Sequence, residues 1–339
     1  MDGSFLSWHY ARKFEPSKKR IGEEKIILMK RLVIFCFIAI SFFAKSQSFD
    51  VVPLGIYGGE KEDNLSSYLV SVAGKNNFLC LDAGTINSGI QKAIENKTFA
   101  TDEATVLKDY IKAYFVSHGH LDHVSGLVIN SPADSKKNIY AIPFVKNILL
   151  QKYFSNDVWA NFSDEGANAI GKYHINAIEP QKNFNIPETD FEAQLFELSH
   201  TKTHLSSAIL IQHQSDYLLY LGDTGADRVE QSNKLENLWK NIAPLIKNKS
   251  LKAIFIEVSF PNAQKENLLF GHLTPKLLNE ELSKLANFVG KENLKGLNIV
   301  ITHRKPTGKN PEIIAEELRN DNPFQVNFVF PEQGKKLSF

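Results

Sequence analysis

The feature that most constrains this chain is a short run, His118-Gly-His-Leu-Asp-His123, that directly follows the apolar, β-type segment Ala113–Ser117. Three imidazoles and one carboxylate so close together are the donor groups that Zn²⁺ and similar borderline cations prefer. Such groups are costly to bury without partners, and a chance surface run rarely follows a strand that looks buried. We therefore expect a fold that presents a metal site at the end of this strand.

Further metal ligands are expected downstream, because four donors do not complete two metal sites. Three residues qualify, each at the end of an apolar β-type segment: His200, Asp223 and His303. Each has an ordinary alternative when taken alone. Either histidine could be a hydrogen-bonded residue at a strand edge, and the aspartate could be a turn former beside Gly222. Together with the first run, and in this order, they indicate one shared site.

Apolar β-type segments alternate with helical ones from residue 49 onward, with no repeat or low-complexity linker. The alternation of polar and apolar residues predicts strands at Val51–Tyr57, Ser67–Val72, Phe78–Asp82, Ala113–Ser117, Asn138–Ile142, Ala193–Leu198, Ser207–Gln212, Tyr217–Leu221, Ala253–Val258, Leu297–Thr302 and Val326–Phe330. Helical periodicity predicts helices at Gly89–Asn96, Val145–Phe154, Lys234–Ile246, Pro275–Phe288 and Pro311–Arg319. We expect a single α/β domain in which helices cover two mixed sheets.

The order His-x-His-x-Asp-His, then His, then Gly-Asp, then a final His resembles the metallo-β-lactamase superfamily over residues 50–330. The resemblance implies an αββα sandwich with its site along one edge. It implies a first metal held by His118, His120 and His200. It implies a second metal held by Asp122, His123 and His303, with Asp223 bridging both. The cofactors implied are two divalent cations, zinc in the first instance, with manganese or iron as alternatives.

A longer segment, from His118 to Pro132, resembles the signature of class II 3′,5′-cyclic-nucleotide phosphodiesterases. Phe78–Gly89, Gly271–Pro275 and Ile301–Pro306 are also similar to that family. The resemblance implies hydrolysis of cAMP, cGMP or both to nucleoside 5′-phosphates. One departure is Ser199-His-Thr201 where Ser-His-Gly is expected, with a second histidine at position 204. His200 and His204 both remain candidates for the third ligand, and we favour His200 because it directly ends the strand.

The catalytic candidates are Asp122, His272 and Glu257. Asp122, with Asp223, would orient the attacking hydroxide. His272, in Gly-His-Leu-Thr, is a candidate general acid or phosphate donor, and Glu257 would orient its imidazole. A comparable Glu and His-x-Thr pair occurs in the related tRNA 3′-processing endonucleases. Alternatively, His272 merely lies near a capped helix start at Thr274-Pro275.

A further carboxylate, Asp82, ends the strand that begins at Phe78. It could support the histidines from behind, as residues around metal ligands commonly do. It could equally be a turn residue before Ala-Gly. Three other histidines, His9, His174 and His213, lie outside any cluster and are expected at the surface.

The formal net charge of +1 gives no global field that would attract a nucleic-acid polymer, so an anionic ligand must be held by a local site. The expected partner is a small cyclic nucleotide, and the oligomeric state, with a homodimer among the options, stays open. The alternative functions are another hydrolase on the same scaffold, namely a nuclease, lactonase or β-lactamase, and a non-catalytic metal-binding protein.

Residues 29–46 read as a secretory signal peptide. Lys30 and Arg31 precede the apolar run 32–43, and Ala44-Lys-Ser46 places small residues before a cut at Gln47. The run is short for a transmembrane helix, which needs about 20 residues, although an uncleaved anchor is the alternative. We expect residues 1–28 to be a non-native upstream extension, and residues 47–339 to be a periplasmic or secreted catalytic domain without a membrane anchor. Removal of Cys36 with the leader would leave Cys80 without a disulfide partner.

Overall fold

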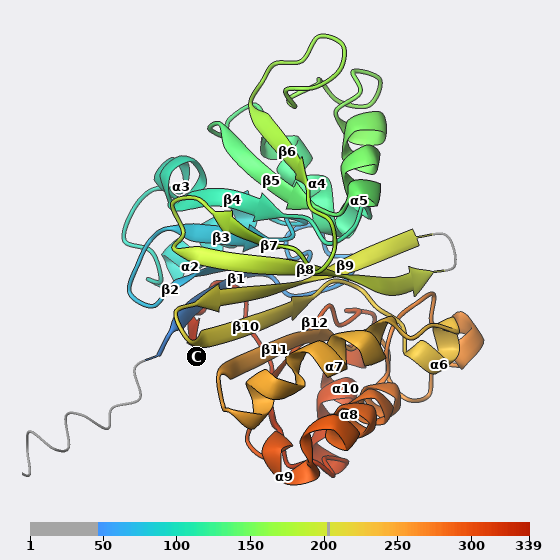
Figure 1. The fold of residues 1–339 in the computed structure, drawn as a ribbon. Coiled ribbons are helices and arrows are strands. Elements are labelled where there is room, and N and C mark those ends of the chain that lie inside the picture. The colour runs from blue at the N-terminus through green and yellow to red at the C-terminus, as the bar shows by residue number, and fades with distance from the viewer. Residues whose placement is uncertain (1–46, 202–203) are drawn as a thin grey trace, which may run out of the picture. The chain divides into compact units, whose positions relative to one another are not determined.

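The computed structural model describes residues 47–201 and 204–339, and residues 47–339 form one compact unit (Figure 1). The predicted extension at 1–28, the predicted signal peptide at 29–46 and His9 lie outside the described residues. Among the residues that are described, no helix has the length and apolar content that crossing a membrane requires.

Within the described residues, the strands form two seven-stranded sheets. The first has the order β14-β1-β2-β3-β4-β5-β6, with bounds Leu337–Ser338, Phe49–Gly55, Ser67–Val72, Phe78–Leu81, Ile111–Phe115, Lys137–Ala141 and Tyr173–Ala177. The second has the order β13-β12-β11-β10-β9-β8-β7, with bounds Asn327–Val329, Asn298–Thr302, Leu251–Glu257, Asp216–Leu221, His204–His213, Phe191–Thr201 and Asn183–Ile186. Both sheets are mixed, because parallel pairing from β3 to β6 and from β10 to β13 adjoins antiparallel pairing.

Helices cover the outer face of each sheet, and the expected αββα sandwich is confirmed (Figure 1). Those in the first half of the chain are α2 Asn87–Glu95, α3 Glu103–Thr105, η1 Val106–Tyr110, α4 Leu121–Asn130, α5 Pro143–Ile148 and η2 Leu149–Tyr153. Those in the second half are α6 Asp227–Glu230, α7 Lys234–Lys247, η3 Glu266–Leu268, α8 Pro275–Val289, α9 Lys291–Leu294 and α10 Asn310–Asn320.

The sequence of β11 shows why the layers form. Phe255 lies in the core between the sheets, whereas Ile254 and Ile256 pack beneath the helices of the second half. Successive side chains of a strand point to opposite faces, so a strand covered on both sides is apolar throughout. In α7, Leu235, Trp239 and the other buried residues recur every three or four positions, which gives the helix one apolar face toward the sheet.

The predicted strands and helices agree with the structure to within a few residues at their ends. The short strands β6, β7 and β14 were not predicted, because each lies at or near a sheet edge and has a mixed polar sequence. The second half of the run 118–123 begins a helix that was not predicted from the sequence. Asp122 and His123 occupy the first turn of α4, because Val124, Leu127 and Val128 at helical spacing bury one face of that helix.

Candidate metal centre

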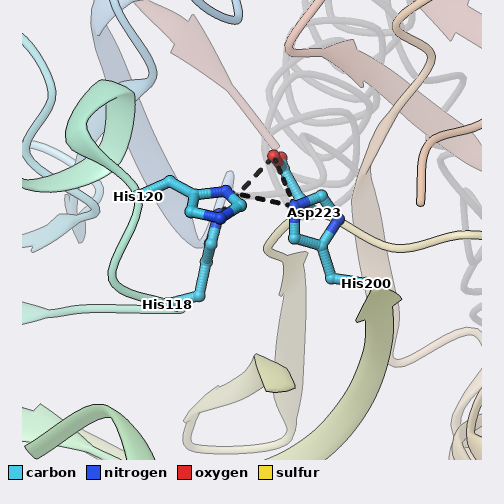
Figure 2. A group of neighbouring side chains, drawn as sticks. All are labelled: His118, His120, His200 and Asp223. Atoms are coloured by element: carbon cyan, nitrogen blue, oxygen red, sulfur yellow. Dashed lines mark hydrogen bonds and ion pairs between the residues drawn. The ribbon is translucent and has the colours of Figure 1, made fainter. Parts of the chain in front are cut away.

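Both sheets deliver polar side chains to one edge of the sandwich. His118 and His120 follow β4, Asp223 follows β10, and His200 lies near the end of β8, and Figure 2 shows these four pointing toward one another. One donor atom from each lies within 4.8 Å of the donor atoms of the others. Asp122, His123 and His303 form a second group of this kind. The structure therefore brings together all seven residues that the sequence singled out, and their role as ligands stays a prediction.

Asp223 occupies the middle of this cluster. Its Oδ2 atom lies 3.2 Å from Nε2 of His303 and 3.3 Å from Nε2 of His123. The same oxygen lies 3.6 Å from Nε2 of His118 and 3.9 Å from Nε2 of His200. One buried carboxylate thus contacts imidazoles of both groups, which is the position that a bridging ligand requires.

Two imidazole nitrogens of the cluster face Asp223 but are buried without a hydrogen bond to any described residue. Nε2 of His118 and Nε2 of His123 form no hydrogen bond, although both rings are almost completely enclosed. Leaving a buried polar atom unsatisfied is costly, and native proteins mostly avoid it. Since both atoms face Asp223, a cation between them and the carboxylate would remove this cost. The donor set and the unpartnered atoms therefore fit divalent metal ions.

The third histidine of the first group is His200 in this structure. Its Nδ1–H donates to the carbonyl oxygen of Gly271 over 2.9 Å, which leaves Nε2 to face His120 Nδ1 at 3.2 Å. The alternative candidate, His204, packs its ring against that of His120, with the centroids 4.7 Å apart, and approaches Phe144 on its other side. The geometry favours His200 as the ligand, with His204 beside the site.

Asp82, at the end of β3, orients two of the histidines. It accepts a hydrogen bond from Nδ1 of His123 over 2.8 Å and one from the hydroxyl of Ser117 over 2.7 Å. Because the serine proton is used in this way, its oxygen can accept Nδ1–H of His118, which lies 3.0 Å away. Both rings are thereby held with Nε2 toward Asp223. The backbone N–H of Ser117 and the hydroxyl of Tyr220 complete the contacts of this carboxylate.

Glu257, at the end of β11, plays a parallel part in the second sheet. Its Oε1 accepts Nδ1–H of His272 over 2.7 Å, and its Oε2 accepts the hydroxyl proton of Ser259 over 2.7 Å. Ser259 in turn can accept Nδ1–H of His303, 3.0 Å away. The pairing expected between Glu257 and His272 is therefore present. Thr274 also caps α8 by accepting from the backbone of Leu277, so the capped helix start and the histidine pair coexist.

Burial lowers the pKa of some histidines in the cluster, whereas nearby carboxylates raise the pKa of another. Burial lowers the pKa of His118 well below its usual value and that of His200 to about 4. Burial alone would also lower the pKa of His123, but the charges of Asp223 and Asp82 outweigh it and raise that pKa. Burial opposes ionisation of Asp223 as well, yet the facing histidines hold the pKa of this carboxyl well below its usual range.

Sequence reasoning missed three neighbours of the site. Ser117 and Ser259 connect carboxylates to histidines, and neither stands out in sequence because a single serine carries no spacing signal. The third is Lys305, whose Nζ lies 3.8 Å from Oδ2 of Asp122. Lys305 follows the last predicted ligand by two residues. Its position within the family-like motif 301–306 could have identified it as a neighbour of the site.

Two glycines and two remote histidines complete the description. A Cβ atom on Gly58 would stand 2.1 Å from the ring of His303, and one on Gly271 would stand 1.4 Å from the carbonyl oxygen of His200, so the site has no room for side chains there. His174 pairs with an exposed aspartate, and the ring of His213 bonds a backbone carbonyl, so both lie outside the cluster as expected.

Comparisons with known proteins agree with one another. Residues 48–334 match the family model of class-II cAMP phosphodiesterases. A 3′,5′-cyclic-nucleotide phosphodiesterase from Aliivibrio fischeri is 40% identical over 326 residues, covering 91% of this chain and 99% of the relative. A probable 3′,5′-cyclic-nucleotide phosphodiesterase from Yersinia pestis is 38% identical, covering 92% and 95% of the two chains. The crystal structure of unliganded yeast PDE1 shares the fold, with a TM-score of 0.77 and 22% identity over 87% of this chain and all of that one.

Proposed function

The chain belongs to the class-II cAMP phosphodiesterases, and we propose that it hydrolyses 3′,5′-cyclic nucleotides, cAMP or cGMP, to nucleoside 5′-phosphates with two divalent metal ions. One observation carries this proposal: Asp223 lies within 4 Å of imidazoles from both predicted metal groups, and two of those imidazoles have buried, unpartnered nitrogens. A phosphodiesterase of 40% identity along nearly the whole chain supports the same reading.

The two cations would occupy two half-sites. The first half-site consists of His118, His120 and His200. The second half-site consists of Asp122, His123 and His303. Asp223 would bind both ions. Zinc is the proposed metal because imidazole and carboxylate suit it, with manganese or iron as alternatives. When bound, a pair of cations neutralises the phosphodiester charge and makes hydroxide available near neutral pH.

The protein's own groups would then position the reactants. Asp122 and Asp223 would orient the hydroxide for attack at phosphorus, in line with the 3′-oxygen. That oxygen leaves as the bond breaks and needs a proton. His272 is the proposed donor through Nε2, because Nδ1 is held by Glu257. Although burial opposes it, the charge of Glu257 raises the pKa of His272 and so favours the protonated ring that a proton donor requires. Attack at phosphorus with loss of the 3′-oxygen gives the 5′-phosphate.

The test is a product analysis with the purified protein, whose metal content is measured on the same sample. We expect cAMP or cGMP to yield only the 5′-phosphate, with turnover lost on chelation and restored by zinc or manganese. Hydrolysis of nitrocefin or of a tRNA precursor in place of cyclic nucleotides would favour another hydrolase on this scaffold. Bound metal without turnover of any phosphodiester would make the protein a metal-binding protein without catalytic function.

We also propose that the protein is exported to the periplasm or secreted. The leader-like sequence at 29–46 supports this proposal, with its predicted cut before Gln47. Ser48 already takes part in the fold, since its backbone N–H donates to the carbonyl oxygen of Phe339. The intact mass of protein recovered from the periplasm or medium should correspond to a chain beginning at Gln47. A mass that includes residues 29–46 would contradict cleavage.

A further inference from the structure

A cavity outside the metal centre contains none of the seven predicted ligands in its described lining. It has a volume of about 280 Å³ and lies between Tyr57, α10 and the chain that follows β13. Its polar lining is dominated by two guanidinium groups, those of Arg304 and Arg319, with Glu312 at the start of α10. Arg304 directly follows His303, the last predicted metal ligand, along the chain.

Arg304 is a buried cation that forms no ion pair with the described residues. Its side chain is only 7% exposed, and its Nε atom is buried without a hydrogen-bond partner. Among the described residues, no carboxylate forms an ion pair with Arg304 or Arg319, whereas Arg228 pairs with two glutamates. Burying a charge without a partner is unfavourable, and native proteins usually supply one.

Aromatic rings compensate only part of this cost. The guanidinium carbon of Arg304 lies 5.5 Å from the ring centre of Phe330 and 5.9 Å from that of Tyr57. Arg319 stacks on the same Phe330 at 4.9 Å. Two cations that share one ring repel each other, and an anion between them would relieve both the repulsion and the missing pairing.

We propose that this cavity binds a phosphate-type oxyanion between Arg304 and Arg319. A planar guanidinium presents paired N–H donors that match the oxygens of phosphate, and two such groups converge here. The cavity volume of about 280 Å³ leaves ample room for a phosphate group. Glu312 opposes an anion and therefore limits its affinity.

Two sources could supply this oxyanion, namely free inorganic phosphate and the phosphate group of a nucleoside 5′-phosphate. Titrations of the metal-loaded protein with inorganic phosphate and, separately, with 5′-AMP distinguish them. Inorganic phosphate binding that responds to the cavity variants, with 5′-AMP binding that does not, identifies the free ion. If the cavity variants change the binding of both inorganic phosphate and 5′-AMP, the cavity recognises a phosphate group whether it is free or attached to a nucleoside.

The variants are Arg319→Gln and Glu312→Gln, with Lys309→Gln as the matched control. Arg319 is exposed, so its replacement leaves the core intact, and Lys309 is an exposed cation just before α10 that does not line the cavity. Phosphate can also bind at the metal centre, but that binding should be the same in all three variants. Differences in phosphate affinity between the variants therefore report on the cavity. Metal content is measured to verify that each variant carries the same metal. We expect Arg319→Gln to weaken phosphate binding roughly tenfold, as the loss of a charge-assisted hydrogen bond does. Glu312→Gln should strengthen it several-fold, by removing a repulsive charge.

Opposite shifts in the two cavity variants, with Lys309→Gln unchanged, establish the site. Equal weakening by Arg319→Gln and Lys309→Gln would mean that phosphate responds only to the general surface charge. No change in any variant would mean that all phosphate binds at the metal centre. Either result overturns the proposal.

Discussion

Two carboxylates on opposite sheets of the sandwich have the same local geometry and different consequences. Asp82, after β3, holds one imidazole directly and a second through Ser117. Glu257, at the end of β11, repeats the arrangement with Ser259. The two histidines held by Asp82 belong to different half-sites. Glu257 instead holds one predicted ligand and His272, which is the proposed proton donor.

The comparison indicates that a fold can reuse one hydrogen-bonding device for two purposes. A carboxylate that fixes the Nδ1 proton of a histidine leaves Nε2 oriented toward the site and makes the ring a better ligand. In the first sheet both rings so fixed are predicted ligands. In the second sheet one of the two carries a proton for the reaction. Asp82 and the two histidines that it holds should therefore govern metal retention. Glu257 and the two histidines that it holds should govern both metal retention and turnover.

Removal of the carboxylate common to both half-sites should have the largest effect. Asp223→Ala deletes the oxygen that lies near imidazoles of both groups. We expect turnover of cAMP to fall by at least about 10³-fold, the scale on which loss of a group that stabilises transition-state charge acts. Kinetics and metal analysis of the same preparation measure both effects. His174→Ala changes an exposed histidine remote from the cluster and should leave both unchanged. An equal loss in the two variants would contradict the assigned roles.

His272→Ala should separate turnover from metal retention. Loss of a general acid costs roughly 10²–10⁴-fold, so cAMP hydrolysis should fall within that range while both metal ions remain bound. An aryl phosphodiester has a leaving group that needs no proton, and its hydrolysis should fall by much less. The two substrates are therefore compared with wild-type and variant protein. A loss of metal would make His272 a ligand, and an equal loss on both substrates would exclude proton donation.

The two carboxylates can be compared directly with Asp82→Asn and Glu257→Gln, which preserve shape and remove charge. Loss of a group that orients metal ligands typically lowers metal affinity by about 10–100-fold. We expect Asp82→Asn to show this loss for both ions. Glu257→Gln should weaken only the second ion and should also reduce turnover in fully loaded protein. Stepwise competition with a chelator, followed by kinetics at saturating metal, separates the effects. Identical behaviour of the two variants would remove the distinction between the clusters.

Sequence reasoning reached the sandwich and the seven converging side chains because both leave regular patterns. Buried strands read as apolar runs, and the ligand candidates follow those runs in a recognisable order. The edge strands β6 and β7 carry no such pattern, because each is the last strand of its sheet and has a neighbouring strand on only one side. Ser117 and Ser259 escaped for a different reason. Each acts by passing a hydrogen bond from a carboxylate to a ring, which depends on positions in space that no local spacing encodes.

The serines provide the finest test of the comparison. Ser117→Ala removes the acceptor of His118 in the first half-site, and Ser259→Ala removes that of His303 in the second. An unsatisfied buried group costs about 1–3 kcal/mol, so each variant should weaken one metal ion by roughly tenfold. The ion affected should differ between the two variants, because the half-sites differ. Ser131→Ala removes another buried hydroxyl, one that donates to the backbone of Val128 at the C-terminal end of α4 and bonds no residue of the metal cluster, and it should change stability without changing metal affinity. If both site variants release the same ion, the hydroxyls do not act on separate half-sites, and the parallel between the two sheets is structural only.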